Sequence, residues 1–144
     1  MQDLTSLKIY RIRSTRKISE IHSEYGSKGV FTVFLKSSIQ YPVEFINEAY
    51  IRSSEYRRTR FRERMSYFIC LMSGETRLER AVLRVGFSEE DHEAIVVTDS
   101  PALREELSTA GISLDTYLPV IKDSKELYGD MTLVQMELVK PDRE

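Results

Sequence analysis

Arginine is concentrated in one short stretch of the sequence, between residues 52 and 64. Guanidinium groups bind phosphates through paired N–H donors, and they stack on aromatic rings and on nucleobases. Only two acids, Glu55 and Glu63, lie in this stretch. Its chemistry favours a polyanion such as RNA as the partner, and the alternative interpretation is a solvated surface. The candidate RNA-binding residues of the stretch are Arg52, Arg57, Arg58, Arg60, Arg62 and Arg64.

Aromatic residues are interleaved with these arginines. They could stack on splayed bases, although packing in the core is the favoured interpretation for each. A second row follows, in which Arg77, Arg80 and Arg84 are spaced to share one face of a helix. The aromatic residues are Tyr50, Tyr56, Phe61 and Tyr67.

Charge is unevenly distributed along the chain, although the net charge is only −2. Residues 1–86 carry 16 Lys and Arg against 9 Asp and Glu, whereas residues 87–144 carry 5 against 14. Steering of a partner depends on the local field rather than on the total charge. The basic half therefore suits a polyanion or an acidic protein, and the acidic half suits a basic partner or serves solubility.

Catalytic motifs are not found in the sequence. It has no HExxH, CxxC, GxSxG or GxxxxGK[ST] pattern. His22 and His92 have no partner at metal-ligand spacing, and the single cysteine, Cys70, reads as a small buried side chain. We therefore expect a protein that is not an enzyme and that uses no metal or cofactor.

Length and composition indicate a single globular domain over residues 1–144, with 41% hydrophobic and 31% charged residues. No apolar run reaches the ~20 residues of a membrane span, and the first residues lack the pattern of a secretion signal. The lone cysteine suits a reducing compartment. We expect a cytoplasmic protein with no membrane partner.

Four segments have the composition of strands. Residues 7–13 alternate apolar and polar side chains, which predicts that Leu7, Ile9 and Ile12 point inward, with a slip near Tyr10. Residues 30–35 and 94–98 are rich in β-branched side chains and predict buried strands. Residues 131–138 alternate again and predict a last strand.

Helical spacing marks the segments between them. We expect helices over residues 16–25, from 37 or 38 to about 53 or 56, from 75 or 76 to 86, and from 101 to 111. Ser14 or Thr15 is the expected cap of the first, and Pro101 the first position of the last. Residues 113–117 are a connector and 122–128 a possible short helix. Residues 65–72 fit a helix or a strand.

These elements predict an α+β fold, with a small mixed, mainly antiparallel sheet of about four strands flanked by helices. The stretch from Met65 to Phe87, MSYFICLMSGETRLERAVLRVGF, then carries a resemblance. It is similar to the signature of the small KEOPS/EKC-complex subunit family that includes the PRPK-binding protein, E-I-L-L-x-x-S-G-x-R-Q-I-x-x-A-I-x-x-x-G. The matching positions are Ser73, Gly74, Leu78, Ala81, Val82 and Gly86.

The resemblance extends over most of the chain. Residues 36–50 resemble the family's strand-then-helix region, with Ala49 at its alanine, and 132–140 resemble its closing strand. The family's Arg-Gln pair falls on Thr76 and Arg77 here. The resemblance favours a helix for residues 65–72.

The resemblance implies a non-catalytic subunit of the complex that makes threonylcarbamoyl-adenosine in tRNA. Such a subunit binds the kinase-like ATPase subunit and captures tRNA at its 3′ CCA end. Arg77 then joins the RNA-binding candidates, and Leu78, Val82, Val85 and Phe87 become candidates for the kinase-like partner. The alternative function is a pure protein-interaction adaptor without direct RNA binding.

Overall fold

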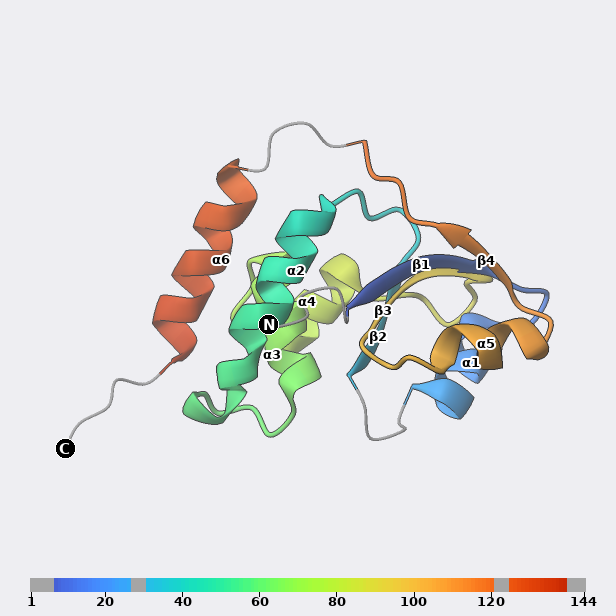
Figure 1. The fold of residues 1–144 in the computed structure, drawn as a ribbon. Helices are drawn as coiled ribbons and strands as arrows, with labels where there is room; N and C mark the ends of the chain where they lie inside the picture. The colour runs from blue at the N-terminus through green and yellow to red at the C-terminus, as the bar shows by residue number, and fades with distance from the viewer. Residues whose placement is uncertain (1–6, 27–30, 121–124, 140–144) are drawn as a thin grey trace. The chain divides into compact units, whose positions relative to one another are not determined.

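The computed structural model describes residues 7–26, 31–120 and 125–139. The chain forms two compact units, and each is assembled from two separate stretches of sequence. The first unit, which we call the sheet unit, comprises Met1–Ile39 and Gly86–Leu118. The second, the helical unit, comprises Gln40–Val85 and Pro119–Glu144. The elements of both are labelled in Figure 1.

The sheet unit is built on four strands in the order β2-β3-β1-β4. Every neighbouring pair is antiparallel, and β1 and β2 both pair with β3 rather than with each other. The α+β class and the four-stranded antiparallel sheet are thus confirmed. The strands are β1 (Lys8–Arg13), β2 (Thr32–Lys36), β3 (Glu93–Thr98) and β4 (Ser113–Thr116).

One face of the sheet is covered by α1 (Ile18–Tyr25) and α5 (Leu103–Thr109), as Figure 1 shows. The register aligns Ile12 with Ala94 and with Leu114, so these side chains share the covered face. Ile12 and Tyr10 therefore contact this core, whereas Ile9 lies on the opposite face of the sheet, in register with the buried Val97. The helices supply Ile18, Ile21, Leu103 and Leu107.

The helix boundaries of the sheet unit differ slightly from expectation. α1 begins after Lys17, whose side chain makes no capping bond, and Ser14 Oγ instead accepts the backbone N–H of Arg16. α5 begins at Leu103 rather than at Pro101. Gly111, with φ of 84°, follows the end of α5 in the left-handed conformation that glycine adopts without strain. Val30 of the second predicted strand lies outside the described residues.

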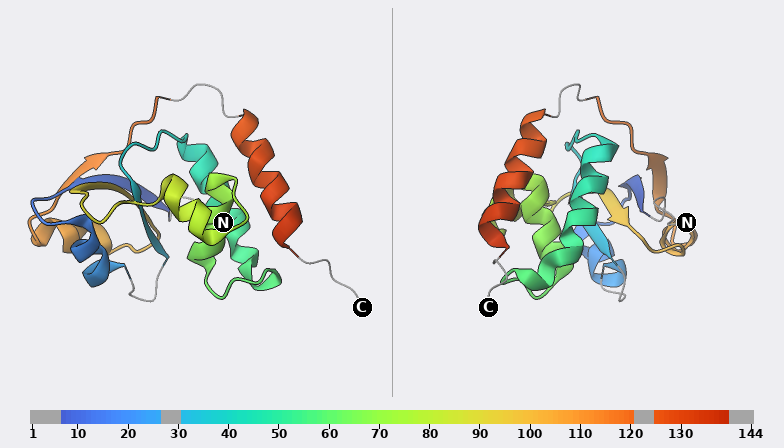
Figure 2. Two further views of the ribbon diagram at one scale, coloured as in Figure 1. Left: turned by 180° about the vertical axis from the view of Figure 1, so that it is seen from behind. Right: turned by 60° about the vertical axis from the view of Figure 1, so that its left-hand side comes forward.

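The helical unit packs around α3 (Arg64–Ser73), which settles the ambiguity of residues 65–72 in favour of a helix. Most of its side chains are buried, and Gly74 ends it with φ of 77°. Figure 2 shows α3 beside the neighbouring helices of this unit. These are α2 (Val43–Arg52), the 3₁₀ helix η2 (Ser53–Arg58), α4 (Leu78–Val85) and α6 (Lys125–Leu138).

Two predicted elements are wrong. Residues 113–116 form β4 instead of a connector, because their backbone pairs with Tyr10–Arg13 of β1 although three of their four side chains are exposed. Residues 131–138, predicted as a strand, belong to α6, in which Met131, Val134 and Leu138 are buried at helical spacing. Residues 122–124 of the predicted short helix and Lys140 of the predicted closing strand lie outside the described residues.

The charge asymmetry along the sequence does not separate the two units. The sheet unit carries 8 Lys and Arg against 11 Asp and Glu, and the helical unit carries 13 against 12. Within the helical unit, however, residues 40–85 hold nine arginines against six glutamates. The basic character is therefore local to this segment. In the part of the chain that the structure describes, no helix is long and apolar enough to cross a membrane.

Candidate nucleic-acid interface

The arginine-rich stretch forms a compact connection between α2 and α3, which we call the arginine connector (residues 53–63). Short side chains fold it back on the helix before it. Ser53 Oγ and Ser54 Oγ donate to the carbonyls of Tyr50 and Ile51 at 2.6 and 2.8 Å. Thr59 Oγ1 donates to the Tyr56 carbonyl at 2.6 Å. These bonds satisfy carbonyls at the helix ends, so the connector holds a defined conformation.

Arg64 fixes the second end of the connector. Its guanidinium donates to Ser53 Oγ at 2.8 Å and to the Tyr50 carbonyl at 2.6 Å, and it lies 4.1 Å from the centre of the Tyr50 ring. The side chain is half-buried. Arg64 thus joins the start of α3 to the end of α2, and its bonding capacity is directed inward.

Arg52 has a similar internal role. It donates to Glu48 at 2.8 Å within α2, and to Thr132 Oγ1 and Gln135 Oε1 of α6 at 3.0 and 3.1 Å. Only 21% of its side chain is exposed. Of the seven arginines predicted to bind RNA, Arg52 and Arg64 are therefore the two that the fold uses to hold helices together.

The other arginines of the connector point their charge to the surface. Arg57, Arg58, Arg60 and Arg62 are all exposed. Arg58 pairs with Glu55 at 3.2 Å, in an ion pair of which both side chains are more than two-fifths exposed. Such a pair contributes little to stability and can exchange for a phosphate. The connector thus presents four guanidinium groups over six residues.

A long-range hydrogen bond adds Arg77 to this group. The guanidinium of Arg60 donates to the Thr76 carbonyl at 2.7 Å, which brings the connector beside the turn between α3 and α4. Arg77 follows Thr76 and is exposed. Arg80 and Arg84 continue the row along α4, and Arg84 lies 3.4 Å from Glu75. We call Arg57, Arg58, Arg60, Arg62 and Arg77 the arginine surface.

The aromatic residues near the arginine surface differ in whether their rings could stack with a base. Tyr67 is fully buried and packs against Phe61 with ring centres 6.4 Å apart, as the core interpretation predicts for Tyr67. The guanidinium of Arg64 covers the Tyr50 ring. Tyr56 and Phe61 are half-buried and lie under Arg57 and Arg60, at 5.3 and 4.8 Å. These two arginine–aromatic pairs are the places where a base could stack.

The residues predicted to contact a protein partner are mostly internal. Val85 is buried, Leu78 is half-buried, and Phe87 packs against the core of the sheet unit. Val82 is 42% exposed. Leu83 is 81% exposed and was not among the predicted contact residues, because it lies off the buried stripe of α4.

Burial suppresses the ionisation of two side chains in the helical unit, Cys70 and Tyr67. Burial raises the pKa of the Cys70 thiol to about 11 and that of the Tyr67 phenol to about 12. Neither group ionises at neutral pH, so neither supplies a nucleophile there. Among residues 7–26, 31–120 and 125–139, no group of three or more His, Cys, Asp or Glu side chains is arranged to hold a metal ion.

Comparison with known proteins does not assign a family to the chain. No protein-family model matches the sequence, and no curated protein matches it.

Proposed function

We propose that this protein is a non-catalytic RNA-binding subunit of a KEOPS-type tRNA-modifying complex. The observation that carries the proposal is the bond between Arg60 and Thr76, which joins the turn before the exposed Arg77 to a connector with four other exposed arginines. The resemblance of residues 65–87 to the small KEOPS/EKC subunits supplies the identity of the RNA and of the complex. Under this proposal the protein has no cofactor, and the chemistry belongs to its partners.

The arginine surface suits a flexible, single-stranded RNA. Guanidinium groups neutralise phosphates, and the half-buried rings of Tyr56 and Phe61 beside two of those groups are candidates for stacking with bases. A single strand can place its bases against such sites, whereas a duplex keeps its bases stacked on each other. The tRNA 3′ CCA end, which the family resemblance implies, is a ligand of this kind.

The proposed contact with the kinase-like ATPase subunit uses α4. Val82 and Leu83 form an exposed apolar pair on this helix, with accessible fractions of 42% and 81%. The apolar pair and the arginine surface belong to the same unit. The protein could therefore bind RNA and its protein partner through different side chains.

The test is a charge reversal in which Arg57, Arg58, Arg60 and Arg62 are all changed to Glu. We expect loss of tRNA binding at physiological salt, measured by fluorescence anisotropy, with retained pull-down of the kinase-like subunit. The control changes the same four residues to Lys. It keeps the charge and should retain most of the salt-dependent binding, while losing the planar guanidinium contacts. Unchanged tRNA affinity in the Glu variant contradicts the proposed RNA surface.

The alternative, a protein-interaction adaptor without RNA binding, predicts a different result. Its specific support is the exposed pair Val82 and Leu83 together with the neutralisation of Arg58 by Glu55. An adaptor shows no steep loss of RNA binding with salt, because it neutralises no phosphates. Changing Leu83 to Asp should then abolish the pull-down in either case, whereas the salt titration separates the two functions.

A further inference from the structure

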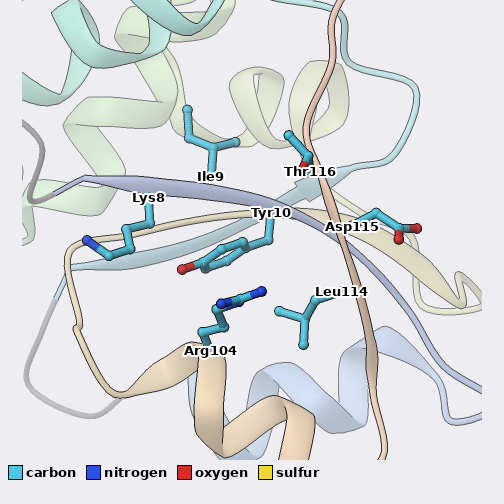
Figure 3. Close-up of a pocket in the computed structure, with 7 residues that line it drawn as sticks. All are labelled: Lys8, Ile9, Tyr10, Arg104, Leu114, Asp115 and Thr116. Atoms are coloured by element: carbon cyan, nitrogen blue, oxygen red, sulfur yellow. The ribbon is translucent and has the colours of Figure 1, made fainter.

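A small pocket in the sheet unit is lined by side chains of both charges. It has a volume of about 310 Å³, at the small end of ligand-binding pockets, and Figure 3 shows the residues that line it. Arg104 is exposed, and the lining also holds Asp115, which pairs with Arg13 at 3.1 Å. This lining selects no class of ligand, whereas α6 in the helical unit has a surface that selects one class of partner.

α6 lies at the outside of the helical unit, with apolar side chains on two opposite sides. Figures 1 and 2 show the other helices of this unit on one side of it. Met131, Val134 and Leu138 face that side and are buried. Leu133 and Met136 leave the helix on the opposite side, and they are 64% and 71% exposed. Packing within the unit therefore explains only the first of these two sets.

The exposed apolar residues of α6 have the spacing of a coiled-coil seam. Gly129, Leu133 and Met136 follow one another at intervals of four and three residues, as alternating d and a positions of a heptad do. A Cβ at Gly129 would meet nothing within 4 Å, so the surface is open at that level. An apolar side chain of a second helix has room to insert there. We call Gly129, Leu133 and Met136 the α6 seam.

The two edges of the α6 seam differ in charge. One edge begins with Lys125 and continues with Thr132, which accepts a hydrogen bond from Arg52 of α2 at 3.0 Å. The other edge is acidic, and its three carboxylates recur at helical spacing, so they lie in one column beside the seam. All three side chains are exposed. The acids are Glu126, Asp130 and Glu137.

We propose that α6 docks a basic amphipathic helix of a partner protein. The apolar stripe of that helix packs on the α6 seam, and its Lys or Arg residues lie against the acidic edge. Burial of Leu133 and Met136 supplies affinity, and the carboxylates select the partner because like charges at this edge would repel each other. The inference goes beyond the proposed function, since it uses neither the arginine surface nor the apolar pair of α4.

A second copy of α6 is a poorer occupant of this surface. Two antiparallel copies of the helix bring their acidic edges together, because a two-fold axis across the pair places like edges side by side. Two parallel copies set the acidic edge against the opposite edge, where α6 contributes one basic residue, Lys125, against three acids. The charges of α6 therefore favour a basic partner over self-association.

The test uses the full chain and two fluorescent synthetic peptides of about three heptads each, with Leu at the a and d positions. One peptide has Lys at the e and g positions and the other has Glu, so repulsion keeps each from pairing with itself. We expect the lysine peptide to bind about tenfold more tightly than the glutamate peptide in anisotropy titrations at physiological salt. Changing both Leu133 and Met136 to Gln should weaken binding of the lysine peptide about tenfold. Both residues are exposed, so this variant should stay folded.

A charge reversal locates the contact on α6. Changing Glu126 and Glu137 to Lys should invert the preference, so that the glutamate peptide binds more tightly. The matched control changes Glu105 and Glu106, exposed acids of α5, to Lys and should keep the preference of the wild type. Sedimentation velocity of the chain alone tests the other occupant, and a dimer that is lost when Leu133 and Met136 are changed to Gln overturns the proposal. Absence of saturable binding by the lysine peptide, equal binding of the two peptides, or inversion by the α5 control also overturns it.

Discussion

Arg60 and Thr76 are joined by a hydrogen bond of 2.7 Å from the guanidinium to the backbone carbonyl, across 16 positions of sequence. This contact fixes the arginine connector to the turn between α3 and α4. It also brings Arg77, which sequence spacing places in a different helix, to the connector. Arg77 thus joins the arginine surface through tertiary structure, by a bond from Arg60, which is itself one of the charged side chains of that surface.

The dual role of Arg60 predicts that it matters more than its neighbour. Arg60→Gln and Arg62→Gln each remove one charge, so each should lower the salt dependence of single-stranded RNA binding by about 0.7 in the log–log slope. Arg60→Gln should cost a further two- to fivefold in affinity, roughly the worth of one surface hydrogen bond. Anisotropy titrations at several salt concentrations measure both quantities. Equal affinities for the two variants would show that the hydrogen bond between Arg60 and Thr76 does not contribute to RNA binding.

Alanine variants of Arg64 and Arg62 form a matched pair that tests the contribution of Arg64 to the free energy of unfolding. Arg64→Ala removes two hydrogen bonds and the contact with the Tyr50 ring, and it should lower the free energy of unfolding by about 2–3 kcal/mol. Arg62→Ala truncates an exposed arginine two positions away, and the change should stay within about 0.5 kcal/mol. Urea denaturation followed by circular dichroism gives both values. A similar loss in the two variants would refute the internal role of Arg64.

Substitution by alanine should change the stability in opposite directions at Gly26 and at Gly129. A Cβ at Gly26 would lie 2.6 Å from the His22 carbonyl oxygen and 2.7 Å from its ring, so Gly26→Ala should destabilise the fold by about 1–3 kcal/mol. Gly129 lies within α6, where a Cβ meets nothing within 4 Å. Gly129→Ala should therefore stabilise by about 0.5–1 kcal/mol. Thermal unfolding of the two variants checks the signs, and a destabilised Gly129→Ala would contradict this packing.

His22 makes the stability of the sheet unit depend on pH. Its ring lies 5.3 Å from each of Phe34 and Phe87, and burial lowers its pKa below the ordinary value. The unfolded chain therefore takes up a proton near pH 6.5 that the folded chain does not, so stability falls as the pH drops below that value. The slope is bounded by one proton, about 1.4 kcal/mol per pH unit.

The check for this dependence is the difference in unfolding free energy between pH 7.5 and pH 5.5. His22→Leu should be less stable at pH 7.5, because it loses the ring contacts, but its stability should change less over this interval. A variant with the full pH dependence of the wild type would assign the effect to other groups.

Periodicity predicted the sheet unit better than the helical unit. Residues 7–13 alternate apolar and polar side chains, and residues 94–98 form a run rich in β-branched side chains. Both patterns are visible in the sequence. In α3 the side chains of Tyr67, Phe68, Cys70, Leu71 and Met72 are all buried. Burial on every side removes the difference between a helical and a strand pattern. The choice there rested on the family resemblance.

The wrong assignments have their own physical causes. In α6 the apolar residues Leu133 and Met136 are exposed, with accessible fractions of 64% and 71%. Together with their polar neighbours they give residues 131–138 an alternation of apolar and polar side chains that resembles a strand. In β4 only Leu114 is even half-buried, so the backbone pairing with β1 left no trace in the side chains. The arginine composition was visible in sequence, but the internal use of Arg52 and Arg64 depends on partners that lie up to 83 positions away.

The central place of β3 governs the order in which the protein can fold during synthesis. β1 and β2 emerge from the ribosome first, yet neither has a strand partner until Glu93–Thr98 has been translated. The helical unit likewise waits for α6, near the end of the chain. The nascent chain therefore carries two apolar strand segments without a strand partner until β3 has been translated, and exposed strand segments of this kind are prone to aggregation.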